Sequence, residues 1–331
     1  WLEVASVLTI HNMAHQPKFP PVTLEHLGIP WSEFRPDALE DFGDVNPFKG
    51  GLYHATMITT VSPRYAHEIR APALGAGLDH VAELRGADLV GILNGIDEEV
   101  WDPARDPLLP ATYDVTDLSG KAVCKAELQR RFGLAEEPHT PLIGLVSRLS
   151  WQKGLDVVAA SLDRLLGLGA QVVLLGSGDA GLEGVFRYLA ELHPGRFGVW
   201  IGYSEPLAHL VEAGSDFFLM PSRFEPCGLN QLYSQRYGTL PIVHATGGLE
   251  DTVEQCNVGE RRGTGFKMYA LHVDALTHTV SWALDVYRNA PDLYRAMQEQ
   301  SMRKRMGWDE AAARYVDVYR WAGQRKGVQL S

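Results

Sequence analysis

The sequence has few cysteines, and they are far apart along its 331 residues: Cys124, Cys227 and Cys256. They form no Cys-x-x-Cys pair and their number is odd, which argues against a disulfide framework. Proteins without such frameworks are typical of reducing compartments. The cysteine pattern therefore favours a protein kept reduced.

Positive charge and long apolar runs are also lacking. Asp and Glu number 41 against 30 Lys and Arg, which gives a formal net charge of −11 at pH 7. This balance argues against non-specific binding of nucleic acid, although it leaves room for a local basic pocket. No uncharged apolar run reaches about 18 residues, so we expect no membrane span.

Two motifs of cofactor chemistry are missing as well. The 12 histidines show no His-Glu-x-x-His or similar spacing, so we expect no metal site. The stretch Gly176-Ser177-Gly178 is not a Gly-x-Gly-x-x-Gly fingerprint, which argues against a nicotinamide enzyme.

The length predicts two domains. The chain begins at Trp1 without a methionine or a leader and enters a predicted strand, Val4–Ile10, almost at once. We therefore expect a fragment whose amino-terminal portion is missing, together with any targeting signal.

From Pro141 onward, short apolar runs alternate with stretches of helical periodicity. This alternation predicts a parallel sheet covered on both faces, with right-handed crossovers, in a doubly wound Rossmann-like domain. The predicted strands are Leu142–Val146, Gln171–Leu175, Val199–Ile201, Phe217–Met220 and Leu240–Val243.

The first hundred residues resemble the second half of another α/β domain. Strands are predicted at Val4–Ile10, Met57–Val61 and Leu89–Leu93, and helices at Gly50–Ala55 and Arg64–Arg70. The polar segment Asp102–Lys121 reads as a connection between the domains. Beyond Asp274 the pattern is helical, over 276–287, 293–306 and 309–321.

The stretch Pro221–Leu232 carries the strongest functional signal. It follows the buried strand Phe217–Met220 and precedes a helix, so Glu225 lies at a sheet edge where open α/β folds bind ligands. The amides of the following helix can hold an anion, and Gly228 lets the backbone approach a ligand. In isolation Glu225 reads as a surface acid. Cys227 reads as a packing residue rather than a nucleophile, because no partner base is evident.

Two cations follow another predicted strand. Arg148 and Lys153 lie just past Leu142–Val146, and both could reach one diphosphate. Such a pair stabilises the charge that develops on a phosphate leaving group. A surface arginine and a helix-start lysine are an equally good reading of the spacing alone. Because a lysine in the first turn of a helix is electrostatically unfavourable, the functional reading gains slightly.

Further candidates follow other strands. The stretch Thr246-Gly247-Gly248-Leu249 reads equally as a phosphate or sugar contact and as a tight turn. His11 and Asn12 end the first strand, and Asn94 ends the third. A lone histidine is more often structural, and an Asn-Gly pair is a turn signal in its own right.

Taken together, these segments resemble the bacterial glycogen synthases and plant starch synthases over essentially the whole chain. The matching motifs occur in family order and at family-like spacing. They are Thr9-Ile10-His11-Asn12, Lys49-Gly50-Gly51-Leu52-Tyr53, Thr60-Val61-Ser62-Pro63, Asn94-Gly95-Ile96-Asp97, Ser147-Arg148-Leu149 with Gln152-Lys153-Gly154, Ile201-Gly202-Tyr203, Pro221 to Leu232, and Thr246-Gly247-Gly248-Leu249.

The resemblance implies a GT-B fold, an α/β architecture of two Rossmann-like doubly wound domains facing a cleft, with the first domain incomplete. Residues 1–96 would form the acceptor-side domain, 97–308 the nucleotide-sugar domain, and 309–331 a helix crossing back to the first. It implies transfer of glucose from ADP-glucose to the non-reducing end of an α-1,4-glucan, with retention at the anomeric carbon. No metal or other cofactor is implied, and the compartment would be the cytoplasm, or a plastid in a plant.

The resemblance also implies residue roles. Arg148 and Lys153 would neutralise the departing diphosphate, Glu225 would hydrogen-bond the donor glucose, Tyr203 would lie near the adenine, and His11 would approach the sugar from the opposite domain. Substrate-binding residues would be Asn12, Asn94, Tyr203, Cys227, Gly228, Leu229, Asn230, Thr246, Gly247 and Gly248.

Some family features are absent, and two other readings stay open. The family's Lys-Thr-Gly-Gly loop is missing, and Asn230 stands where bacterial members commonly have threonine. One alternative is another GT-B enzyme, such as a sucrose- or trehalose-forming glucosyltransferase or a glucan phosphorylase. The other is a non-catalytic fragment that binds glucan or nucleotide.

Overall fold

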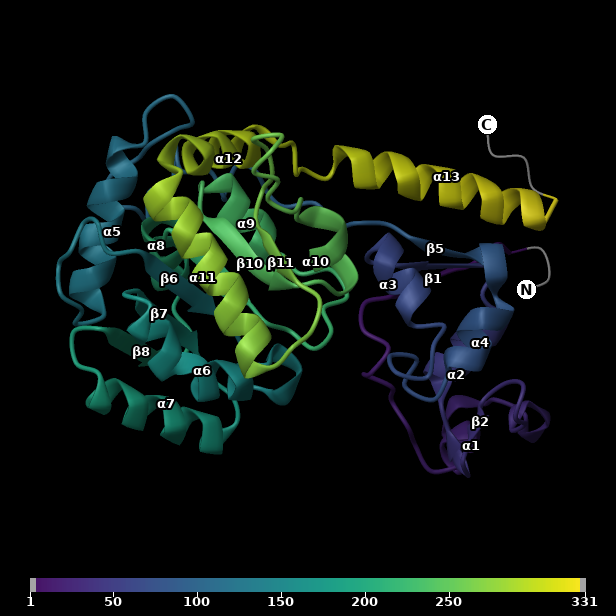
Figure 1. Cartoon of the computed structure of the whole chain (residues 1–331). Helices are drawn as coiled ribbons and strands as arrows, with labels where there is room; N and C mark the ends of the chain where they lie inside the picture. The colour runs from purple at the N-terminus through teal and green to yellow at the C-terminus, as the bar shows by residue number, and fades with distance from the viewer. Residues whose placement is uncertain (1–3, 328–331) are drawn as a thin grey trace. The chain divides into compact units, whose positions relative to one another are not determined.

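The computed structural model of the chain describes residues 4–327, which form two compact units (Figure 1). Unit 1 comprises Trp1–Gly95 and Trp308–Ser331 within the described residues, and unit 2 comprises Ile96–Gly307. Each unit has its own parallel sheet and its own apolar core.

Unit 2 is built on a six-stranded sheet in the order β11-β10-β9-β6-β7-β8, and every pairing in it is parallel. This confirms the predicted α/β class and the predicted strands, with shifts of one or two residues at some ends. The strands are β6 (Leu142–Val146), β7 (Gln171–Gly176), β8 (Phe197–Ile201), β9 (Phe217–Met220), β10 (Leu240–His244) and β11 (Phe266–Met268).

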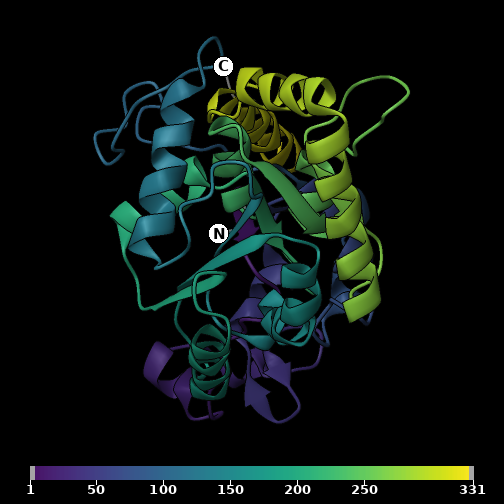
Figure 2. The same ribbon diagram turned by 60° about the vertical axis from the view of Figure 1, so that its left-hand side comes forward.

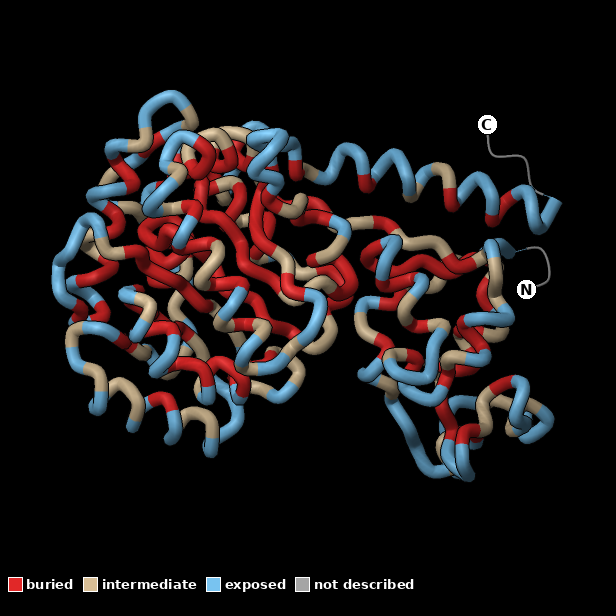
Figure 3. Tube along the Cα trace, in the orientation of Figure 1, coloured by how far each residue is buried: buried red, intermediate tan, exposed pale blue. Residues whose placement is uncertain are grey.

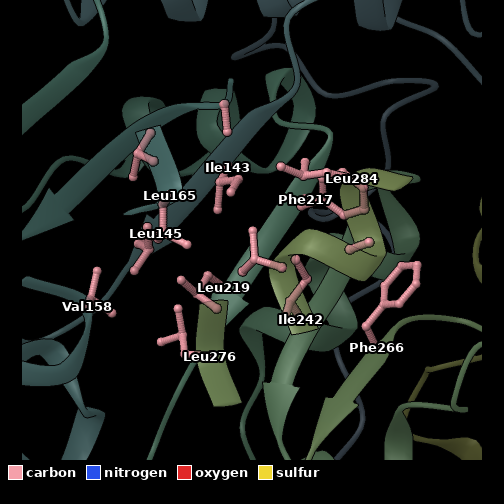
Figure 4. Packing of buried hydrophobic residues seen from close by; sticks show 14 of the residues in the cluster. Ile143, Leu145, Val158, Leu165, Phe217, Leu219, Ile242, Phe266, Leu276 and Leu284 are labelled. Atoms are coloured by element: carbon pink, nitrogen blue, oxygen red, sulfur yellow. The ribbon is translucent and has the colours of Figure 1, made fainter. Parts of the chain in front are cut away.

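The strands of unit 2 read as continuous apolar runs because both faces of the sheet are buried. Along β9, Phe217 and Leu219 point into one core, while Phe218 and Met220 point into the other. Figure 3 shows the resulting buried path through the sheet, and Figure 4 shows the packing on the first face. There the β9 side chains meet those of helix α11, among them Leu276.

Helices cover both faces of this sheet. Helices α5 and α8 pack on the Phe218 face, and α6 and α11 pack on the Phe217 face. In Figure 2, α5 and α11 lie on opposite sides of the strands. The helices of unit 2 are α5 (Ser119–Arg131), η3 (Trp151–Lys153), α6 (Leu155–Gly167), α7 (Ala180–Leu192), α8 (Glu205–Gly214), α9 (Asn230–Arg236), α10 (Gly247–Thr252), α11 (Val273–Asn289) and α12 (Pro291–Arg303).

Unit 1 contains a three-stranded parallel sheet in the order β1-β4-β5. Its strands are β1 (Val7–Ile10), β4 (Met57–Thr60) and β5 (Leu89–Gly91), with a small hairpin of β2 (Glu40–Asp41) and β3 (Asp44–Val45). Its helices are α1 (Thr23–Leu27), η1 (Trp31–Glu33), α2 (Pro47–His54), α3 (Pro63–Glu68), α4 (Asp79–Leu84), η2 (Gly86–Asp88) and α13 (Asp309–Arg325). Val318 of α13 is fully buried beside Met57 of β4, so the last helix is part of this unit's core.

The segment 102–121, which was predicted to connect the domains, packs within unit 2. The carboxylate of Asp106 is buried and lies 2.7 Å from Nδ1 of His209, and it accepts a hydrogen bond from the Tyr237 hydroxyl. Burial opposes ionisation of Asp106, but these hydrogen bonds outweigh it and lower its pKa. The polar residues of this segment therefore include buried ones such as Asp106.

The spacing of apolar residues did not predict helix α5, because the buried face of this helix is largely polar. Lys121, Lys125 and Gln129 follow one another at four-residue spacing and are all buried. The Lys121 ammonium donates to the Ala213 carbonyl at 2.8 Å, and that of Lys125 lies 2.7 Å from the Asp216 carboxylate. Burial lowers the pKa of Lys121 to about 8.

Within residues 4–327, no helix is both long enough and apolar enough to cross a lipid bilayer.

The centre of unit 2 supplies a stability test at Phe217. This ring is fully buried, with the rings of Tyr294, Phe266 and Tyr287 at centroid distances of 5.5, 6.0 and 6.0 Å. We expect Phe217→Ala to lower the free energy of unfolding of unit 2 by about 3–5 kcal/mol, measured by urea denaturation. The exposed Leu192 is the control, and Leu192→Ala should change it by less than about 0.5 kcal/mol. Equal effects of the two changes would contradict this account of the core.

Candidate functional site

The site begins with two neighbouring strands. β6 and β9 pair directly, with Ile143 opposite Phe217, so the loops that follow them leave the same edge of the sheet. The first loop leads through η3 to Lys153, and the second contains Glu225. Sheet topology therefore brings together two residues that are 72 positions apart in the sequence.

Lys153 and Glu225 form an ion pair. The Lys153 Nζ lies 2.5 Å from Oε2 of Glu225, and the Ser222 hydroxyl donates to the same oxygen at 2.9 Å. Glu225 is only 6% exposed, so its charge is compensated by both a cation and a hydroxyl donor. The backbone of the loop 222–225 is held by His244, whose Nδ1 lies 2.7 Å from the Ser222 carbonyl oxygen.

A cavity of about 290 Å³ opens beside this pair. Seven of the predicted site residues line it: Arg148, Lys153, Tyr203, Glu225, Gly228, Leu229 and Asn230. Arg148 and Tyr203 are exposed at its surface, and Tyr203 is 84% exposed. The side chain of Asn230 donates to the Val146 carbonyl at 2.7 Å and thereby ties the start of α9 to the end of β6.

The two loops touch through their backbones at Gly154. This residue has a φ of +68°, and a Cβ there would lie 2.0 Å from the Pro221 carbonyl oxygen. Only glycine fits such a close approach in a left-handed conformation. Lys153 is therefore held next to the Glu225 loop by the residue that follows it.

The glycine pair after β10 lies behind the cavity. A Cβ on Gly247 would meet the Glu225 carbonyl at 2.0 Å, and one on Gly248 would meet the Cys227 carbonyl at 2.0 Å. The Gly248 amide donates to the Glu225 carbonyl at 3.0 Å. Cys227, Thr246, Gly247 and Gly248 do not line this cavity in the described part of the chain. These residues are all buried and support the loop that carries Glu225.

The remaining predicted residues belong to unit 1. His11 and Asn12 directly follow β1, and Asn94 follows β5, so all three lie at the carboxyl edge of the unit 1 sheet. His11 is exposed, and the Asn12 side chain accepts a hydrogen bond from the Ala14 amide at 3.0 Å.

Ser222 and His244, which hold the Glu225 turn, were not among the predicted site residues. Gly176, the last residue of β7, and Ser177 also line the cavity. They belong to a glycine turn that the sequence indicated only weakly as a phosphate or sugar contact, because short glycine turns are common. Nothing in the local pattern distinguishes Ser222 from an ordinary loop serine.

Chemically, the cavity combines two cationic groups with one buried carboxylate. Cations at a strand end suit an anionic ligand such as a phosphate ester, and a carboxylate suits hydroxyl donors. No described side chain caps the start of α9, and the first amides of a helix generally lack an acceptor within the helix. The site therefore suits a molecule with a phosphate part and a hydroxylated part.

Comparison with protein families agrees with this chemistry. Residues 1–83 match the starch synthase catalytic domain, and residues 127–303, more than half of the chain, match the glycosyl transferases group 1 family. The chain is thus a glycosyltransferase by family.

Relatives narrow the assignment. Glycogen synthase 1 of Geobacter sulfurreducens is 50% identical over 98% of this chain and 65% of its own length. Glycogen synthase 1 of Methylococcus capsulatus is 46% identical over 99% of this chain and 67% of its own length. The chain belongs to the glycogen and starch synthase family, and it spans about two thirds of the length of these relatives.

Solved structures give the same result. The catalytic domain of starch synthase IV from Arabidopsis thaliana, bound to ADP and acarbose, matches with a TM-score of 0.90 at 32% identity, over 96% of this chain and 67% of that one. Sucrose-phosphate synthase from Thermosynechococcus elongatus shares the fold, with a TM-score of 0.59 at 17% identity over 95% and 67% of the two chains. The GT-B fold class predicted from the sequence is confirmed.

The close approach at Gly154 supplies a test of the site's geometry. We expect Gly154→Ala to lower the free energy of unfolding of unit 2 by about 1–3 kcal/mol, because a Cβ would combine a left-handed φ with a clash at Pro221. Urea denaturation measures it. Gly167, at the other end of α6, has no atom within 4 Å of an added Cβ, so Gly167→Ala is the control and should be neutral or slightly stabilising. A neutral Gly154→Ala would disprove the constraint.

Proposed function

We propose that this protein is a glycogen synthase, which transfers glucose from ADP-glucose to the non-reducing end of an α-1,4-glucan with retention at the anomeric carbon. The observation that carries the proposal is the Lys153–Glu225 pair beside Arg148 in one cavity of unit 2. The names of the relatives and the ADP and acarbose in the starch synthase IV structure support it.

In this proposal, Arg148 and Lys153 bind the diphosphate of the donor. When the bond between the glucose and the phosphate breaks, negative charge grows on the departing ADP. Two cations fixed beside it stabilise that charge more in the transition state than in the ground state, which raises the rate. Glu225 already holds Lys153 in place, so little reorganisation of the ammonium is needed.

The other residues bind the two ends of the donor. Glu225 accepts hydrogen bonds from glucose hydroxyls, and the amides of Gly228, Leu229 and Asn230 hold phosphate at the start of α9. Tyr203, on the exposed rim of the cavity, packs against the adenine. The buried residues Cys227, Thr246, Gly247 and Gly248 shape the same loop from behind.

We assign the nucleotide-sugar role to unit 2 and the acceptor side to unit 1, with boundaries near residues 96 and 308. We assign His11, Asn12 and Asn94, which share one sheet edge of unit 1, to sugar binding. The α-1,4-glucan is the proposed acceptor, and neither a metal nor another cofactor takes part. The cytoplasm is the proposed compartment, which suits the three free cysteines.

The cations supply the direct test. In the complete gene product, Lys153→Ala and Arg148→Ala should each lower the turnover of ADP-glucose by roughly a hundred- to a thousand-fold, or about 3–4 kcal/mol of transition-state stabilisation. Transfer of labelled glucose to maltodextrin measures it. Arg187→Ala is the control, because Arg187 pairs with Glu183 on the surface of α7, and it should leave turnover unchanged. Near-normal turnover in both cation variants would refute the assignment.

The alternatives have distinct outcomes in the same preparation. A glucan phosphorylase would show the absorbance of a pyridoxal Schiff base, and another glucosyltransferase would prefer a different donor or acceptor. Binding of ADP and maltodextrin without turnover would favour a non-catalytic binding protein.

A further inference from the structure

Arg223 lies in the site loop, between Ser222 and Glu225, yet it does not line the cavity in the described part of the chain. Its guanidinium instead forms an ion pair with Asp156 at the start of α6. Nη1 and Nη2 each lie 2.7 Å from one carboxylate oxygen of Asp156, which is a bidentate pair. Arg223 is therefore bound to the loop that carries Lys153.

Two more contacts make the same connection. Nη1 of Arg223 also donates to the Trp151 carbonyl at 2.6 Å, and the guanidinium carbon lies 4.4 Å from the centre of the Trp151 ring. The Arg223 amide donates to the Gln152 carbonyl at 2.8 Å. One arginine thus holds η3 by its backbone, its charge and its planar face. A lysine would keep the backbone bond and the charge, but not the bidentate pair or the stacking of the guanidinium on Trp151.

The contacts of Arg223 join two of the loops that border the cavity. Its contacts fall on Trp151, Gln152 and Asp156, on both sides of Lys153, while Arg223 itself is two residues from Glu225. The Lys153–Glu225 distance of 2.5 Å is therefore set by two backbone segments that Arg223 fastens together. The Arg223 hydrogen bonds also lower the pKa of Asp156, so the carboxylate is ionised throughout the neutral range.

We propose that Arg223, with Asp156 and the Trp151 ring, is a positioning clamp that sets the Lys153–Glu225 geometry for glucosyl transfer. The inference rests on the proposed function, in which Lys153 neutralises the leaving diphosphate. None of the three residues lines the cavity in the described part of the chain. Because the Asp156 side chain is 44% exposed, the pair contributes little to global stability, so its main consequence is the placement of the two site residues.

The test uses Arg223→Lys and Asp156→Asn, singly and together, in the complete gene product. We expect each single change to lower kcat with ADP-glucose by about tenfold or more, with KM for the donor within about threefold. The double variant should be no slower than the slower single one, because both changes open the same clamp. Asp156→Glu, which keeps a bidentate carboxylate, should recover most of kcat, and melting temperatures should stay within about 2 °C.

A second ion pair on the same helix provides the matched control. Arg164 of α6 pairs with Asp274 at 2.5 Å, away from the cavity. Arg164→Lys and Asp274→Asn remove a more exposed pair, with side chains 55% and 79% exposed against 22% and 44% for Arg223 and Asp156, and should leave kcat unchanged. If these changes slow transfer as much as the clamp variants do, the effect is not one of positioning and the proposal is wrong.

A crystal structure of the Arg223→Lys variant tests the clamp without an activity measurement. We expect the Lys153 Nζ to move beyond about 4 Å from the Glu225 carboxylate, the usual limit of an ion pair. If the wild-type protein transfers no glucose, the proposed function fails, and this distance alone decides whether the clamp sets the geometry. An unchanged distance, or wild-type kcat in both single variants, would overturn the clamp.

Discussion

The parallel pairing of β6 with β9 is the constraint on which the site depends. Because parallel strands end at the same edge, the loops after them are forced into contact whatever their distance in sequence. Lys153 and Glu225 meet for that reason, and the cavity beside them is closed by loops that leave the neighbouring strands β7 and β8. A register change in this one pairing would displace every charged group of the site.

The strands of unit 2 were predictable because burial on both faces produces uninterrupted apolar runs. Arg148, Lys153 and Glu225 were predictable for a related reason, since each lies in the segment between such a run and the next helix. The edge strand β11 was missed because its three residues, Phe266–Met268, are too few for a periodic signal. Ser222 was missed because a serine three residues before Glu225 looks like any other loop serine. His244 was missed because its partner, the Ser222 carbonyl, lies 22 positions away in the sequence.

The glycines of the site show a second limit of sequence reasoning. A glycine after a strand indicates that something comes close to the backbone, but not whether it is a ligand or another loop. Gly154, Gly247 and Gly248 all face carbonyl oxygens of the chain itself. They allow three loops to pack without side chains between them, and so leave the cavity wall to Glu225 and its neighbours.

The buried lysines of α5 have a consequence for how the domain assembles. An apolar helix can slide along a sheet at small cost, whereas Lys121 and Lys125 reach particular carbonyl and carboxylate groups at Ala213 and Asp216. A shift by one turn would leave two buried amino groups without partners, at a cost comparable to that of losing a large core side chain. The buried lysines therefore favour one placement of α5 over placements shifted by a turn.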